Sequence, residues 1–278
     1  MRTLSKRDTI VVTASLLLLG PRAPAPAQTP KRAQAPAYRA PRGSDGKPNL
    51  NGVWQAIGSA HWDVEAHPAR AGSVVSLGAV GAIPGGLGVV EGGRIPYLPW
   101  AEQKKKENAE GWMTLDPEVK CYLPGVPRAT YLPFPFQIIQ TPNHILITYE
   151  FASASRIVYM NRPDFESPID TWMGHSRGRW EGDTLVIDVT SFNDQTWFDR
   201  AGNFHSDALH VVERYTAVSP GALRYEATIE DPKVFTRPWK ISLPLYRRLE
   251  KTVQLLEFKC VEFVEELMYG NLRKKAGK

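Results

Sequence analysis

The sequence predicts a mainly β protein, a single antiparallel barrel-like domain with a few short helices and a long arm rich in glycine and proline. Short runs rich in Ile, Val, Tyr and Phe recur at regular spacing from Phe136 onward, with turn residues between them. These runs do not alternate with helical segments in the way that indicates a parallel sheet. A closed barrel also leaves no strand edge unpaired, so it suits a set of short strands of this kind.

The first 27 residues have the pattern of a secretory signal peptide. Arg2, Lys6 and Arg7 form a positive start, an uncharged apolar run follows at 9–20, and Ala-Pro-Ala at 25–27 is a suitable cleavage site. A helix of that run would be about 18 Å long, against a hydrocarbon core of about 30 Å, so a cleaved signal is favoured over a permanent anchor. We therefore expect an exported protein, periplasmic or extracellular, with no transmembrane segment after signal removal.

Residues 28–47 predict a disordered tether, because proline, alanine and charge dominate them. The whole chain has 34 basic and 29 acidic residues, a net charge of +5. The tether holds five basic residues and one acidic residue, whereas 48–278, the expected single β-rich domain, holds 25 and 27. The positive charge therefore belongs to the leader and the tether, and no nucleic-acid partner is expected.

The first half of the domain is predicted to contain little regular structure. A strand is expected at 50–55, and the glycine-rich residues 72–97 are either a lid over a pocket or a surface loop. Residues 98–108 predict a helix, because a proline near the start is followed by strong helix formers. Proline-punctuated residues 116–135 predict an extended arm.

The second half is predicted to hold most of the strands. They are expected at 136–141, 144–151, 155–160, 185–189, 208–216, 223–229, 239–246 and 253–259. A short helix is expected at 261–272, followed by a basic tail. Cys121 and Cys260 are either a disulfide, as an oxidising compartment would favour, or two separate buried thiols.

Candidate functional residues concentrate at 172–214, which contains three of the six histidines together with carboxylates, arginines and tryptophans. Neutral histidine beside a carboxylate suits acid–base chemistry, and arginine suits an anionic group. Tryptophan walls suit a ring-bearing or sugar-like ligand. The candidate catalytic residues are His175, Asp194, Asp199, His205 and His210, and the candidate ligand-binding residues are Arg177, Arg179, Trp197 and Arg214.

Each of these residues also has a simpler interpretation. Trp-Glu-Gly-Asp-Thr at 180–184 favours a tight turn with a packed tryptophan. His210 and Arg214 share one face of the strand predicted at 208–216, and Glu213 lies on the other. If the face of His210 is inside the barrel, both groups need partners or a ligand; if outside, they are surface residues. The histidine spacing is not diagnostic of a metal site, so no metal is assigned, and no sequence fingerprint identifies a cofactor.

Two resemblances bear on the fold. Gly52-Val53-Trp54 resembles the first strand of lipocalin-like (calycin-like) barrels, which implies that the tryptophan closes the barrel floor and that the glycine lets the chain pass close beneath it. The segments 116–142, 172–216 and 227–247 resemble a family of exported bacterial β-rich proteins. That resemblance covers nearly all of the chain after Leu50 and implies a location outside the cytoplasm, without assigning an activity to any residue.

Two main functional hypotheses follow from the sequence. The first is an exported pocket enzyme, such as a lyase, isomerase or hydrolase, that uses His/Asp acid–base chemistry on a small aromatic or sugar-like molecule. The second is a periplasmic lipocalin-like carrier of an apolar small molecule. A third, an envelope interaction module, has only the basic tether and tail in its favour. The fold alone does not separate these functions, and the oligomeric state is not predicted.

Overall fold

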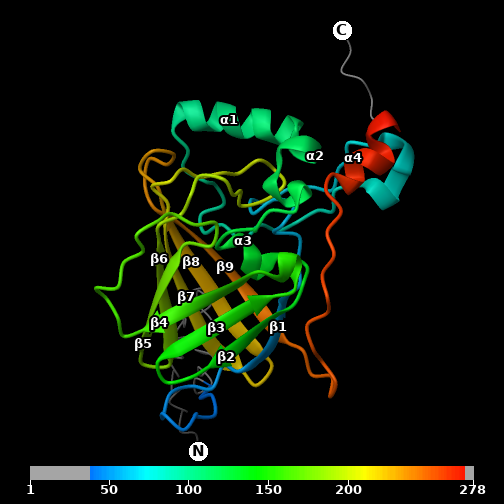
Figure 1. Ribbon diagram of the computed structural model, residues 1–278. Coiled ribbons are helices and arrows are strands. Elements are labelled where there is room, and N and C mark those ends of the chain that lie inside the picture. The colour runs from blue at the N-terminus through cyan, green and yellow to red at the C-terminus, as the bar shows by residue number, and fades with distance from the viewer. Residues whose placement is uncertain (1–37, 273–278) are drawn as a thin grey trace, which may run out of the picture. The chain divides into compact units, whose positions relative to one another are not determined.

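The computed structural model describes residues 38–272, in which nine strands form a closed barrel with a few short helices (Figure 1). The predicted mainly β, barrel-like fold is confirmed. The strands are β1 (Gly52–Ala56), β2 (Phe136–Gln140), β3 (His144–Tyr149), β4 (Ser155–Met160), β5 (His175–Glu181), β6 (Thr184–Thr190), β7 (His210–Ser219), β8 (Ala222–Glu230) and β9 (Trp239–Arg247).

The helices are few and lie mostly at one end of the barrel (Figure 1). They are α1 (Pro99–Glu110), α2 (Trp112–Leu115), α3 (Arg128–Tyr131) and α4 (Val264–Tyr269), with 3-10 turns η1 (Val75–Gly81), η2 (Pro117–Lys120), η3 (Phe151–Ser153) and η4 (Gly270–Leu272). The helix predicted at 98–108 is α1, and the segment predicted as helical at 261–272 contains α4 and η4. Between residues 38 and 272, no helix combines the length and the apolar character that crossing a bilayer requires.

Neighbouring strands pair antiparallel, except that β4 and β5 are parallel. This exception is possible because the connection 161–174 returns the chain to the other end of the barrel before β5 begins. Strand β5 was not predicted, whereas a strand was predicted at 253–259, where the structure has none. That prediction is wrong because β9 already pairs with β8 on one side and with β1 on the other, so the closed barrel offers no further edge.

The Gly-x-Trp sequence opens β1. Trp54 is buried, and its indole Nε1 donates a hydrogen bond to the carbonyl oxygen of Leu50 at 2.9 Å. The guanidinium carbon of Arg247 lies 4.2 Å from the centre of the Trp54 ring. Gly52 has a φ of 139°, and a Cβ there would collide with the Arg247 guanidinium, so this position requires glycine.

The barrel interior, as far as the structure describes it, is mostly apolar and contains a buried ion pair. Arg156 of β4 contacts Glu213 of β7 through both guanidinium Nη atoms, at 2.5 and 2.9 Å. The hydroxyls of Tyr215 and Tyr225 donate to Glu213 Oε1 at 3.0 and 2.8 Å, and Arg156 Nη1 donates to Ser176 Oγ at 3.3 Å. Because a buried charge is costly unless it is paired and hydrogen-bonded, this network fixes how β4, β5, β7 and β8 face one another.

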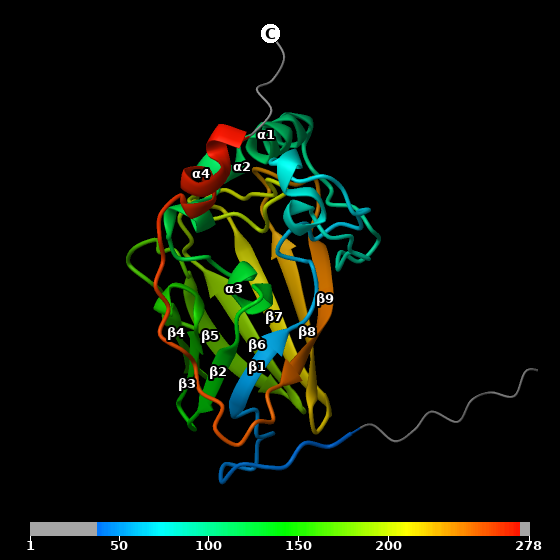
Figure 2. The same ribbon diagram turned by 90° about the vertical axis from the view of Figure 1, so that its right-hand side faces the viewer.

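The two ends of the barrel differ (Figure 2). At the narrow end, short turns join β2 to β3, β5 to β6 and β7 to β8. At the opposite end lie the segments 57–135, 191–209 and 261–272, which we call the crown. Residues 248–260 run along the outside of the barrel from the narrow end to the crown (Figure 2).

The crown is tied to the C-terminal part of the chain by a disulfide between Cys121 and Cys260, which is one of the two alternatives that the sequence left open. Next to it, the Phe263 amide donates to the Val119 carbonyl at 2.7 Å. The bridge spans 139 residues of sequence. In the chain-entropy model, a loop of this length contributes on the order of 4–5 kcal/mol to stability.

The predicted signal peptide at 1–27 and the first part of the predicted tether lie outside the described residues. The last part of the tether, 38–47, is described and contains a turn in which the Gly43 amide donates to the Lys47 carbonyl at 2.8 Å. Arg42 forms an exposed ion pair with Asp183, in the turn between β5 and β6, at 2.8 Å. These residues therefore contact the narrow end of the barrel.

Candidate functional site

His175 lies on the outside of the barrel, beneath the connection 161–174. Its ring is stacked on Tyr159 with centroids 5.4 Å apart, and Nε2 donates to the Phe165 carbonyl at 2.8 Å. Side chains alternate along a strand, so the buried Ser176 points inward and His175 points outward. The histidine therefore holds the connection against the barrel wall.

His210 also lies on the outer wall, in a row of charges that crosses three strands. Asp188 of β6 accepts from Arg177 Nη2 at 2.7 Å and from His210 Nε2 at 3.1 Å. The hydrogen bond from His210, aided by Arg177, lowers the pKa of Asp188 to about 2. The same hydrogen bond raises the pKa of His210. This His–Asp pair is thus a partly exposed ion pair.

The other two candidate arginines share one exposed carboxylate on the same wall. Glu181 accepts from Arg179 at 2.6 Å and from Arg214 at 2.9 Å. Arg214 and His210 therefore face outward, and Glu213, between Val212 and Arg214, faces the interior. The open question about the two faces of this strand is settled in favour of the outer wall for His210 and Arg214.

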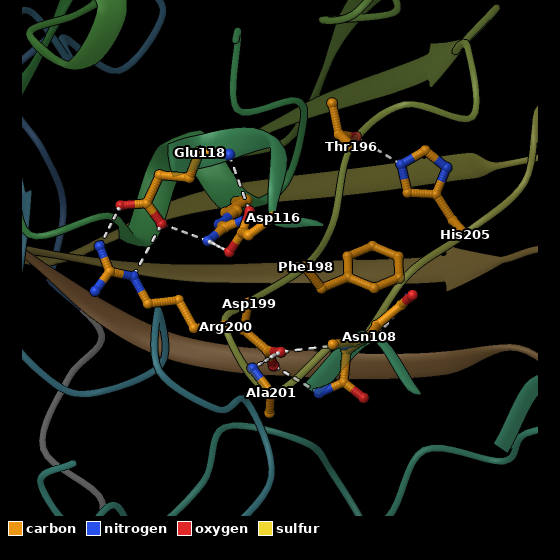
Figure 3. Close-up of polar contacts among 12 residues, drawn as sticks. Asn108, Asp116, Glu118, Thr196, Phe198, Asp199, Arg200, Ala201 and His205 are labelled. Atoms are coloured by element: carbon orange, nitrogen blue, oxygen red, sulfur yellow. Dashed lines mark hydrogen bonds and ion pairs between the residues drawn. The ribbon is translucent and has the colours of Figure 1, made fainter. Parts of the chain in front are cut away.

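His205 lies in the crown, buried, with both ring nitrogens in use (Figure 3). Its Nδ1 lies 2.8 Å from the Ser206 carbonyl, which can only accept, so Nδ1 donates. Nε2 then accepts from the Thr196 hydroxyl at 2.6 Å. Burial lowers the pKa of His205, which keeps the imidazole neutral. The arrangement fixes the fold of the loop 191–209.

Asp199 is fully buried in the same loop and accepts hydrogen bonds from four N–H groups (Figure 3). Its Oδ1 accepts from the Ala201 and Asn203 amides, and Oδ2 accepts from the Val64 amide and the Asn203 side chain, at 2.6–3.3 Å. Burial, together with the nearby Asp63 carboxylate, raises the pKa of Asp199 to about 7. Asp199 therefore joins the loop 191–209 to the segment that follows β1.

The last two candidates are also in this loop. Asp194 is exposed, and Trp197 packs against the apolar cluster of Val74, Trp112 and Met113. The candidates do not gather in one concavity. His175, His210 and the three arginines lie on the outer wall, whereas Asp194, Trp197, Asp199 and His205 lie in the crown. Among residues 38–272, no group of three or more His, Cys, Asp or Glu side chains has an arrangement that could hold a metal ion.

A second buried charge cluster, in the crown, was not singled out from the sequence. Arg128 of α3 pairs with Asp116 at 2.7 and 2.8 Å and also contacts Glu118. Glu118 in turn pairs with Arg200 at 3.0 Å (Figure 3). Against the effect of burial, Arg128 and Arg200 lower the pKa of Glu118 to about 2. No short motif marks these residues, because they meet only when the segments 116–131 and 191–209 fold together.

A cavity of about 490 Å³ opens at a seam in the barrel wall. The seam arises because β9 changes its partner: Ser242 and Lys240 bond to Val89 and Glu91, whereas the next pairing, from Leu245 onward, is with β1. We call this space the wall cavity. Its lining residues are Ala56 to Ala60, Asp63, Pro84 to Val89, Tyr131, Leu243 and Pro244.

The glycine-rich segment forms one wall of this cavity and is anchored. Gly86 and His67 exchange backbone hydrogen bonds at 2.9 Å in both directions. The His67 ring bridges the carbonyls of Glu65 and Pro84 at 2.8 and 3.0 Å. Gly86 has to be glycine, because a Cβ there would collide with Ser59 and His67. At Gly88 a Cβ would collide with the backbone of Ala66, so close packing accounts for glycine at these two positions.

Asp63 is the one charged residue among the described residues that line the wall cavity. It is largely buried, and its Oδ1 accepts from the Glu65 amide at 3.0 Å. The rest of the lining is apolar side chains and backbone, apart from the hydroxyls of Ser59 and Tyr131. Mostly apolar walls with a few fixed polar groups are typical of small-molecule sites.

Comparison with known proteins, both with family models and with curated sequences, gives no match to this chain. Function is therefore inferred from the site itself.

Proposed function

We propose that the protein is a carrier that binds a small, mostly apolar organic molecule in the wall cavity. The observation that carries this proposal is the cavity itself, a space of about 490 Å³ with apolar walls and one carboxylate, Asp63. A partly buried carboxylate favours a ligand with a cationic or hydrogen-bond-donating group at one end. The ligand class that fits is an amine or alcohol on an aromatic or aliphatic body.

We propose in addition that the protein works outside the cytoplasm. The basic, apolar and small-residue pattern of 1–27 supports export. The Cys121–Cys260 disulfide is compatible with an oxidising compartment.

A second candidate function, acid–base catalysis at the same cavity, rests on one observation. The pKa of Asp199, behind Asp63, is raised to about 7, partly by the Asp63 carboxylate. A carboxyl group whose pKa lies near neutrality is suited to proton transfer. Asp199 already accepts four hydrogen bonds, however, which leaves little capacity for a substrate, so the carrier is favoured.

Binding of 1-naphthylmethylammonium and of its neutral analogue 1-naphthalenemethanol, measured by calorimetry, tests the carrier. Gly58 lines the cavity, and a Cβ there would meet nothing within 4 Å, so Gly58→Val adds bulk to the lining without a clash at Cβ. We expect Gly58→Val to raise the dissociation constant of both ligands about tenfold or more. Gly221→Val is the matched control, since a Cβ in that turn at the narrow end also meets nothing within 4 Å.

Asp63→Asn separates charge from shape. The asparagine retains an oxygen that can accept from the Glu65 amide. We expect the affinity for the cation to fall about tenfold and the affinity for the alcohol to fall much less. Asp194→Asn, the same change on an exposed carboxylate of the crown, should leave both affinities unchanged. Equal binding by wild type and Gly58→Val would contradict the proposed site. Turnover of a bound ligand that stops in Asp63→Asn would favour the enzyme instead.

A further inference from the structure

A second cavity, of about 210 Å³, lies in the crown between η1, α2 and α4. Its side-chain walls include Trp62, Val74, Leu77, Trp112, Met113 and Tyr269. We call it the crown pocket. In Figure 1, α4 and the segment containing η1 lie together beside α2. The lining adjoins that of the wall cavity, because Trp62 and Ile83 line the crown pocket while Asp63 and Pro84 line the wall cavity.

The walls of the crown pocket are aromatic, and their orientation is fixed. The rings of Trp62 and Trp112 meet edge to face, with centroids 5.7 Å apart and planes at 79°. The Arg200 guanidinium lies 4.7 Å and 4.8 Å from the two ring centres. Trp112 Nε1 donates to Ser73 Oγ at 3.2 Å. The two indoles are thus held in place before any ligand binds, which lowers the entropic cost of binding.

The charges near this pocket are in ion pairs, although Glu265 Oε2 is buried without a hydrogen-bond partner among the described residues. Glu265, which lines it, accepts from Arg200 at 3.1 Å, and Arg200 also pairs with Glu118 at 3.0 Å. An ionic ligand would therefore have to compete with existing ion pairs. An uncharged aromatic ring would only displace water from the aromatic walls of the pocket. The residues that follow in the sequence, 273–278, are Arg-Lys-Lys-Ala-Gly-Lys, and their side chains do not suit an apolar pocket.

The C-terminal segment completes the pocket. Tyr269 and Glu265 come from α4, which is held to the crown by the Arg200 ion pair, by the Phe263–Val119 hydrogen bond and by the disulfide at Cys260. At the opening, Val80 is 94% exposed. Apolar residues at a pocket mouth favour entry of an apolar molecule.

We propose that the crown pocket is a second ligand site, which binds a small, uncharged aromatic molecule of about the size of indole. Trp62, Trp112 and Tyr269 supply its recognition surface. The attachment of α4 through Cys121–Cys260 keeps the site complete. The two cavities are lined by neighbouring residues at 60–63 and 82–84, but this proposal does not rest on the carrier function proposed for the wall cavity.

The test uses 5-fluoroindole and the full mature chain, with binding followed by ¹⁹F NMR. Tyr269→Ala removes one wall, and we expect it to weaken binding about tenfold. Leu267→Ala, on the exposed side of the same short helix, is the matched control and should bind as wild type does. The double variant Cys121→Ser/Cys260→Ser should also weaken binding, because α4 is then less firmly attached.

Two results would overturn the proposal. One is a Tyr269→Ala protein that retains its circular dichroism spectrum and binds 5-fluoroindole as tightly as wild type. The other is loss of binding in Gly58→Val but not in Tyr269→Ala, which would place the probe in the wall cavity and leave the carrier proposal standing. Loss of 5-fluoroindole binding in Tyr269→Ala, with unchanged binding in Gly58→Val, supports the crown pocket. This outcome does not depend on whether the wall cavity binds a ligand.

Discussion

The barrel and the crown are held together by different kinds of contact. In the barrel, short turns join neighbouring strands, so most contacts are between elements adjacent in sequence. In the crown, segments far apart in sequence meet through buried ion pairs, the Asp199 hydrogen bonds and a disulfide that spans 139 residues. Both cavities lie on surfaces that crown segments provide. A regular barrel thus supports a less regular region in which ligand sites can form.

Each region also contains a buried arginine, and the two arginines differ in their surroundings. Arg156 in the barrel faces one carboxylate, Glu213, supported by tyrosine hydroxyls. Arg128 in the crown faces two carboxylates, of which Glu118 is shared with Arg200. The barrel pair is part of one cooperative core, whereas the crown cluster joins separate segments. Their removal should therefore have different consequences.

The largest effect is expected from Arg156→Met in the barrel. It leaves Glu213 buried without its cation, so we expect the free energy of unfolding to fall by about 3–5 kcal/mol in urea denaturation. Adding Glu213→Leu should recover most of that loss, because an apolar pair replaces an uncompensated charge. A loss below about 1 kcal/mol in the single variant would mean that the ion pair does not stabilise the barrel.

Arg128→Met should have a smaller and more local effect, a loss of about 2–3 kcal/mol. Hydrogen exchange should accelerate at 116–131 and 198–203, while amides of β6 to β8 retain their protection. If the barrel amides exchange as fast as those of the crown, the two regions unfold as one unit, and the comparison between them is wrong.

The histidines of the two regions should respond to pH in opposite directions. In the crown, burial lowers the pKa of His61 to about 4, so the unfolded chain binds a proton first and stability falls as pH drops below 6.5. On the outer wall, the pKa of His210 is raised by Asp188, so its contribution is present below pH 6.5 and is lost as pH rises through the folded-state pKa.

Urea denaturation between pH 4 and pH 8 measures this difference. His61→Gln should remove about 1–2 kcal/mol of the loss at low pH, a value reduced for partial solvent exposure. His210→Gln should lower stability at pH 5 more than at pH 8. The same slope of stability against pH in wild type and both variants would contradict these assignments.

The smallest effect is expected on the outer wall. Arg214→Ala breaks an ion pair with Glu181 in which both side chains are partly exposed. Such pairs contribute about 0–1 kcal/mol, and salt screens them, so we expect a change within that range that disappears in 1 M salt. A larger, salt-independent loss would show that Arg214 has a role beyond the surface pair.

The barrel was predictable because its signals are local. Alternation along 208–216 separates Glu213 from His210 without knowledge of any other strand. Strand β5 was missed because the inward residues Ser176 and Gly178 are small, and its outward residues are polar, which hides the alternation. The strand predicted at 253–259 has a suitable composition, but a closed barrel leaves it no partner.

The site was less predictable because it depends on contacts between distant segments. The residues at 172–214 are close in sequence, yet the fold places them on an outer wall and in a crown. Asp63 was not singled out, because a lone aspartate in a loop belongs to no motif. It becomes a candidate only when the fold places it near Asp199 and the seam at β9. Arg156 likewise resembles any polar residue on a strand until Glu213 lies opposite it.

Amide chemical shifts of the mature protein, followed during titration with 1-naphthylmethylammonium, test most directly whether the wall cavity is the binding site. The account predicts that the largest shifts fall at 58–63 and 85–89 and that in Gly58→Val they require about tenfold more ligand or more. Shifts confined to the neighbourhood of His175 and His210, unchanged in that variant, would contradict it.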